Sequence, residues 1–131
     1  MPNKIAALTL LTIISACGPL PQVTSRSAIA LTSGQRNMIE QTISHDLVDP
    51  GSAQYGSMAA AKVTKDDGSV NIYICGEMNS KNRMGGYVGF SAYSGILSAT
   101  RDAFTLLGID GTDYPYYADF CRDTVGLSVS H

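Results

Sequence analysis

One stretch of the chain carries side chains at the spacing of an α-helix. Its mostly apolar positions recur every three or four residues and share one side of a helix: Met38, Ile39, Thr42, Ile43 and Leu47. Upstream, Thr32 and Gln35 have the T-x-x-Q spacing of a capping box, and downstream Pro50 cannot continue a helix. The pattern therefore predicts an N-terminal helix that begins after Thr32 and ends before Pro50.

Beyond residue 57 the pattern changes to short runs typical of β-strands. We predict strands at residues 58–64, 70–75, 87–93 and 103–109. In the second run Ile72 and Ile74 alternate with Tyr73, as in a strand buried on one face only. The third run alternates around Val88 and Phe90 in the same way.

The C-terminal part of the chain is expected to form a second helix, capped by Thr112 and ended by Gly126. Three residues share one face of this helix: Tyr117, Phe120 and Cys121. Together the patterns predict an α+β fold. Its core is a small antiparallel sheet of three to four strands, with an N-terminal and a C-terminal helix, arranged in two layers.

The first residues have the pattern of an export signal. Lys4 precedes twelve uncharged, mostly apolar residues, which as a helix span about 18 Å and are too short for a hydrocarbon core of about 30 Å. We therefore assign residues 1–16 to a signal peptide. The sequence Ile14-Ser15-Ala16-Cys17 resembles the bacterial lipobox, and this resemblance implies cleavage before Cys17 and attachment of lipid to its sulfur. The alternative is an ordinary signal peptide that is cut nearby.

The rest of the chain divides into a tether and one domain. Residues 17–31, the lipidated Cys17 and a stretch rich in proline and serine, are expected to be a flexible tether, and residues 32–131 a single α+β domain. Gly18 stands where an aspartate resembles an inner-membrane retention signal. By that analogy the protein is expected to face the periplasm from the outer membrane.

The cysteine count supports export. If Cys17 carries lipid, then Cys75 and Cys121 remain, and an even pair in an exported domain indicates a disulfide. The alternative is two buried free thiols. Neither cysteine lies in a C-x-x-C motif, so no metal site is predicted, and no cofactor is expected. The net charge of −2 and the pI near 5.5 argue against nucleic acid as a partner.

Two segments carry a resemblance to a protein group. Asp49-Pro50-Gly51-Ser52-Ala53-Gln54-Tyr55 and the stretch from Cys75 to Phe90, CGEMNSKNRMGGYVGF, resemble a group of small exported bacterial and phage proteins without assigned activity. Gly108-Ile109-Asp110-Gly111-Thr112 and Cys121-Arg122 look like the rest of the shared pattern. The resemblance implies a fold and a disulfide but no chemistry.

Polar and aromatic residues crowd the second of these segments and form the candidate binding site: Glu77, Asn79, Lys81, Asn82, Arg83 and Tyr87. Such donors, acceptors and one ring could recognise a glycan, a peptide or a partner surface. The alternative is a purely structural hairpin. In that case the asparagine side chains bond the backbone, and Gly85-Gly86 supplies a positive φ.

These observations favour a non-enzymatic cell-envelope lipoprotein, anchored in the membrane by lipid, that binds an envelope protein or a cell-wall fragment. A periplasmic inhibitor or exclusion factor is the alternative, and a protruding loop that fills a cleft would favour it. An enzyme acting on the cell wall is the remote alternative. It would need a deep pocket that converges on His45, and no catalytic residue is predicted.

Overall fold

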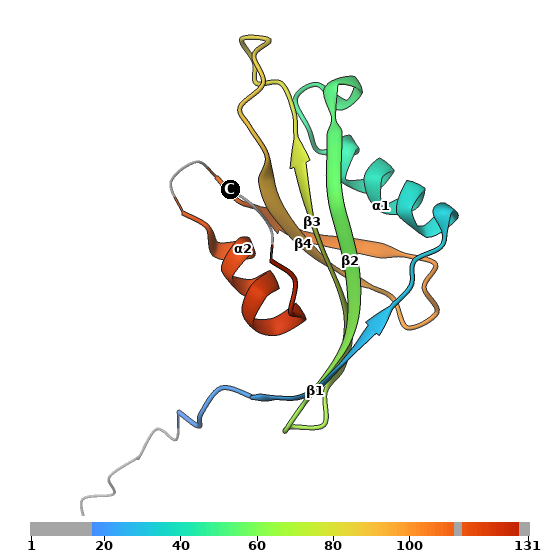
Figure 1. Cartoon of the computed structure of the whole chain (residues 1–131), viewed down its shortest axis with the longest axis vertical. Helices are drawn as coiled ribbons and strands as arrows, with labels where there is room; N and C mark the ends of the chain where they lie inside the picture. Colours follow the sequence, from blue (N-terminus) through green and yellow to red (C-terminus); the bar gives the residue numbers. More distant parts are fainter. Residues whose placement is uncertain (1–16, 112–113, 129–131) are drawn as a thin grey trace, which may run out of the picture.

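The computed structural model describes residues 17–111 and 114–128 (Figure 1). The predicted signal peptide, residues 1–16, and the predicted cap Thr112 lie outside the described residues. In chain order the elements are β1 (Val23–Ile29), α1 (Ser33–His45), a 3₁₀ turn η1 (Pro50–Ser52), β2 (Gln54–Lys65), β3 (Val70–Asn79), β4 (Ser91–Leu97), β5 (Phe104–Ile109), α2 (Tyr116–Phe120) and a π-helical turn η2 (Cys121–Val125).

The centre of the fold is an antiparallel sheet in which the five strands lie in chain order, β1-β2-β3-β4-β5. The antiparallel pairing confirms the sequence prediction, but the sheet has five strands and not three to four. The additional strand is β1, which lies in the segment expected to be a flexible tether. Its Arg26 pairs with Val63 of β2, and the Arg26 guanidinium donates to the carbonyl oxygens of Asp123 and Thr124 in η2.

Helix α1 covers one face of the sheet. Its capping box is present as predicted. The Thr32 hydroxyl accepts from the backbone N–H of Gln35 at 3.2 Å, and the Gln35 side chain accepts from that of Thr32 at 3.0 Å. Ile39 and Ile43 of α1 are fully buried. They belong to a hydrophobic cluster whose other buried members come from β2 to β5: Met58, Ala60, Ile72, Ile74, Met78, Tyr93, Leu97 and Phe104.

The C-terminal helical segment covers the opposite face, so the fold has three layers and the two-layer expectation was wrong (Figure 1). Tyr73 and Cys75, which point away from the Ile72 side of β3, belong to a second cluster with Cys121 and Val125. The Tyr73 ring meets the Phe120 ring edge to face at 5.1 Å. Strand β3 is therefore buried on both faces, not on one as predicted.

The predicted disulfide is confirmed. Cys75 in β3 is bonded to Cys121, their Cα atoms are 5.8 Å apart, and neither residue is exposed to solvent. The bond fixes the third layer to the centre of the sheet. No helix within residues 17–111 and 114–128 is long and apolar enough to cross a membrane.

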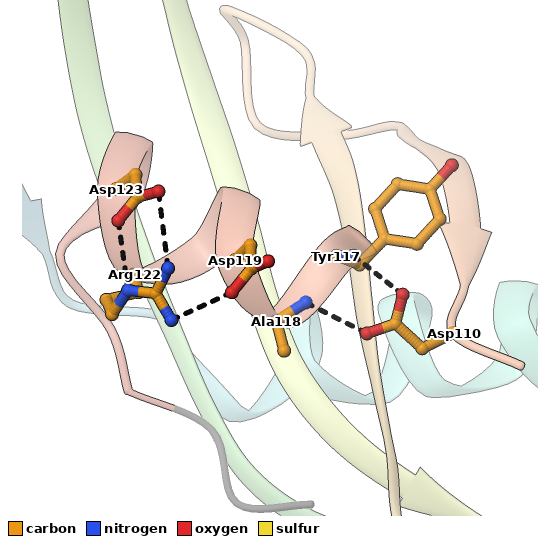
Figure 2. Close-up of polar contacts among 6 residues, drawn as sticks. All are labelled: Asp110, Tyr117, Ala118, Asp119, Arg122 and Asp123. Carbon is orange, nitrogen blue, oxygen red and sulfur yellow. Dashed lines mark hydrogen bonds and ion pairs between the residues drawn. The ribbon is translucent and has the colours of Figure 1, made fainter. Parts of the chain in front are cut away.

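Helix α2 begins after Pro115, and a residue from outside the helix supplies its cap (Figure 2). The carboxylate of Asp110, which follows β5, accepts from the backbone N–H groups of Tyr117 at 2.6 Å and Ala118 at 2.9 Å. Gly126, with φ 78°, ends η2 as predicted. At the surface, Arg122 pairs with two neighbouring carboxylates (Figure 2).

Candidate binding site

The segment that joins β3 to β4, residues 80–90, is called the distal loop here. It extends beyond the end of the sheet, on the side opposite the N-terminal residues 17–22 (Figure 1). Lys81 and Tyr87 pair across its base through an isolated antiparallel bridge. The loop contains four of the six predicted site residues, while Glu77 and Asn79 are among the last three residues of β3, directly before it.

Two asparagines hold the loop from within. The Asn82 side-chain oxygen accepts from the backbone N–H groups of Met84 at 2.9 Å and Gly86 at 3.1 Å. The side-chain oxygen of Asn79 accepts from the N–H of Gly89 at 3.0 Å, and Asn79 is almost fully buried. Gly85, with φ 79°, makes the turn that these bonds enclose. Asn79 and Asn82 therefore shape the loop, and of the two Asn79 is buried while Asn82 is exposed.

Ser52 of η1 joins the loop to the rest of the domain. Its hydroxyl accepts from the Lys81 backbone N–H at 2.9 Å and donates to the Asp49 carbonyl at 2.8 Å. Its carbonyl oxygen accepts from the Tyr87 hydroxyl at 3.1 Å. Sequence reasoning missed this role of Ser52. One signal was available. The Asp49-Pro50-Gly51-Ser52 turn and the loop both belong to the pattern that resembles the group of small exported proteins.

Lys81 and Tyr87 come together as the candidate site requires. The Lys81 ammonium lies 5.5 Å from the centre of the Tyr87 ring, within the range of a cation–π contact. The Tyr87 ring is nearly half exposed although its hydroxyl is bonded to Ser52. The pair thus presents a positive charge and one aromatic face in a fixed geometry.

The outer surface of the loop is more apolar than predicted. The Met84 side chain is 94% exposed, Val88 54% and Phe90 44%, and Arg83 beside Met84 is also exposed. The prediction of a strand at residues 87–93 was wrong in its first half. Gly89 has φ 100°, far from the values of a regular strand, and its N–H donates to the Asn79 side chain, so β4 begins only at Ser91.

Glu77 stands apart from the other candidates. It pairs with Ala92 in the sheet, and its side chain lies across Gly56 of β2, where a Cβ atom would be 2.8 Å from Oε2. The same Cβ would be 3.4 Å from the Phe90 ring, so Glu77 and Phe90 lie close together at the base of the loop. The six predicted residues therefore separate into two inner supports, one residue at the base, and Lys81, Arg83 and Tyr87 at the surface.

The histidine considered for catalysis lies on an open part of the surface. The His45 side chain is 89% exposed, and its Nδ1 is 3.2 Å from the Asp46 carboxylate. It borders a hollow of about 570 Å³ between α1 and the start of β2, which also includes Glu40 and Tyr55. Burial raises the pKa of Tyr55, whose hydroxyl donates to the Glu40 carbonyl. Within the described part of the chain, no three histidine, cysteine, aspartate or glutamate side chains are grouped to hold a metal.

Comparison of the chain with protein-family models, with curated proteins and with solved structures finds no match. The function is therefore argued from the geometry of the distal loop and of the N-terminal segment.

Proposed function

We propose that this protein is a non-enzymatic lipoprotein of the cell envelope that binds a partner protein through its distal loop. The observation that carries this proposal is the contrast between the inside and the outside of the loop. Inside, Asn79, Asn82 and Ser52 bond its backbone. Outside, Met84 and Val88 are exposed.

A loop fixed in this way loses little conformational freedom when a partner binds, which lowers the entropic cost of the complex. Its exposed side chains are also of the types enriched in the centres of protein interfaces: Arg83, Met84, Tyr87 and Phe90. A cell-wall glycan is the weaker candidate ligand, because Met84 and Val88 are exposed beside the polar groups of the loop, and such apolar side chains suit a protein surface better than a sugar. We therefore favour a protein.

The alternative of an inhibitor or exclusion factor has one observation in its favour. The loop projects past the sheet (Figure 1), and a firm projecting loop suits a concave site on an incoming enzyme. The enzyme alternative has less support, because His45 borders an open hollow in place of a deep pocket. Binding and inhibition differ only in what the partner does, so the same variants test both.

The proposed anchor lies at the other end of the molecule. Cys17 is exposed and is not part of the disulfide. Because β1 begins at Val23, the connection between Cys17 and the sheet spans at most about 20 Å. Lipid on Cys17 would hold the domain close to the membrane, with the distal loop pointing away from it. The outer membrane remains the favoured location.

The test is affinity capture from an envelope extract, followed by binding measurements with the purified captured protein. Arg83→Ala with Met84→Ser alters only exposed side chains, whereas the control Lys65→Ala with Leu107→Ser removes a similar pair far from the loop. We expect the loop variant to lose at least tenfold in affinity and the control to match the wild type. If both variants bind like the wild type, the loop is not the binding surface. A fall in the partner's enzymatic activity on binding would identify an inhibitor.

A further inference from the structure

A second feature lies at the end of the sheet opposite the distal loop. Strand β3 runs from Val70 to Asn79, and the distal loop follows its last residue, so Val70 marks the far end. Here a hollow of about 480 Å³ opens between the start of β3, the end of β4 and the turn before β5. We call it the basal hollow. Its wall is apolar, formed mainly by Val70, Ile72, Ile96 and Leu97, and Val70 is half exposed.

The two charged residues that line the basal hollow are both cationic. Lys62 and Arg101 line it, and no acidic residue is among the nine that do. The neighbouring Asp102 is not among the lining residues. The hydroxyls of Thr100 and Ser98 hold its carboxylate in its own turn and lower its pKa, so it stays negatively charged outside the hollow. The hollow therefore combines an apolar wall with two positive charges at its rim.

The turn fixes the position of Arg101. Within residues 17–111 and 114–128, Arg101 is the one residue other than glycine with a positive φ, at 61°. Its N–H donates to the Ser98 carbonyl at 2.9 Å, and its carbonyl accepts from the Gln35 side chain of the capping box at 3.3 Å. A residue with a positive φ is common near the end of a short hairpin turn, so the turn between β4 and β5 determines where the Arg101 side chain leaves the backbone.

The N-terminal connection ends beside the hollow. The backbone N–H of Gln22 donates to the Asp66 carboxylate at 2.9 Å, and the Asp66 N–H donates to the Gln22 carbonyl at 2.9 Å. Asp66 begins the turn that leads into Val70. The last residue before β1 is thus bonded to the turn that leads into the wall of the hollow.

We propose that the basal hollow binds the anionic headgroup of a membrane lipid, with Lys62 and Arg101 on the phosphate and Val70 against the upper part of the acyl chains. That the hollow faces a membrane depends on the proposed lipid anchor at Cys17. That its ligand is anionic depends only on the charges and the apolar wall of the hollow. Each basic residue near an anionic bilayer contributes roughly a fivefold gain in binding. The two together orient the domain with its distal loop away from the bilayer.

The experiment uses the chain from residue 17 onward, which contains every described element, with Cys17→Ser so that no lipid anchors it. Sedimentation is measured with vesicles of phosphatidylcholine alone and of phosphatidylcholine mixed with phosphatidylglycerol. The test variant is Lys62→Gln with Arg101→Asn, because asparagine tolerates a positive φ. The matched control is Lys81→Gln with Arg83→Asn, which removes the same charge at the distal loop. Thermal unfolding shows that each variant is folded.

We expect binding to the anionic vesicles only, a loss of more than tenfold in the test variant, and little change in the control. Equal losses of binding in both variants would mean that the vesicles attract the protein through its overall charge. A wild-type hollow that does not bind anionic vesicles would show that it is not a lipid site. Either result overturns the proposal. Soluble glycerol phosphate that binds as tightly as the vesicles would reassign the hollow to a free phosphate compound and also overturn it. None of these outcomes bears on partner binding by the distal loop, which has its own variants.

Discussion

The bond between Cys75 and Cys121 should contribute a large share of the stability of this domain. The two residues are 46 positions apart, and closing a loop of that length in the unfolded chain costs entropy equivalent to about 4 kcal/mol. Domains of this size are stable by only about 5–15 kcal/mol in total. Apart from this bond, the third layer is held by a small apolar contact around Cys121 and Val125 and by the hydrogen bonds of Asp110 and Arg26.

The clean measurement is urea unfolding of the wild-type protein in its oxidised and fully reduced forms. Because the sequence is the same, the two forms differ only in the cross-link and not in the side chains that fill the core. We expect the reduced form to be less stable by about 4 kcal/mol, which at a slope of about 1.5 kcal/mol per molar urea moves the midpoint by roughly 2–3 M. Intact mass without reductant should show two hydrogens missing.

The location of the sulfurs adds a kinetic expectation. Neither cysteine is exposed to solvent, so a reductant should reach the bond only when the third layer opens, and reduction should accelerate when urea is added. A difference of less than about 1 kcal/mol between the two forms would refute the argument from loop closure. A full complement of free thiols in the purified protein would show that the bond is not formed.

Three further predictions concern single substitutions. The Tyr93 hydroxyl is buried and lacks a hydrogen-bond partner among the described residues, so Tyr93→Phe should raise the free energy of unfolding by about 1–2 kcal/mol; a loss of stability would show that the hydroxyl has a partner. Burial also raises the pKa of Tyr93, so the folded state favours its protonated form. The free energy of unfolding should therefore be unaffected by this group below the unfolded pKa of about 10 and should fall as the pH rises above it. Urea unfolding at a series of pH values should show a smaller fall in Tyr93→Phe than in the wild type. A Cβ atom at Gly108 would collide with the Tyr117 hydroxyl, so Gly108→Ala should lower the free energy of unfolding by about 1–3 kcal/mol, and an unchanged unfolding transition would contradict that close approach. Cys17→Ser should move the protein out of membranes washed in high salt, which removes electrostatic binding, whereas continued sedimentation with salt-washed membranes would contradict the lipid anchor.

Local sequence patterns were sufficient to predict those features for which a residue type has a single common structural role. The Thr32 and Gln35 pair predicted the start of α1, and the cysteine count predicted the disulfide. Strand β1 could not be predicted in this way. Five of its seven residues are exposed, so it has no alternation of buried and exposed positions. Its place is decided by backbone bonds to β2 and by Arg26, and sequence patterns do not record such long-range contacts.

The candidate site was only partly predictable for a related reason. An asparagine near a turn can bond the backbone or face a ligand, and both arrangements place it in the same polar sequence. The structure assigns Asn79 and Asn82 to the backbone. Val88 and Phe90 alternate as strand residues do, but the positive φ of Gly89 between them places both in an exposed loop.

The third layer, in contrast, could have been inferred from the order of residues in β3. Side chains of a strand alternate between its two faces, so Cys75 points away from the face that carries Ile72 and Ile74. If α1 covers the isoleucines and Cys75 is bonded to Cys121, then the C-terminal helical segment must lie on the opposite face, as it does. A sheet covered on both faces leaves its edge strands and its two ends for contacts with other molecules. One end carries the N-terminal connection, and we therefore expect a protein partner to approach at the other, where the distal loop projects.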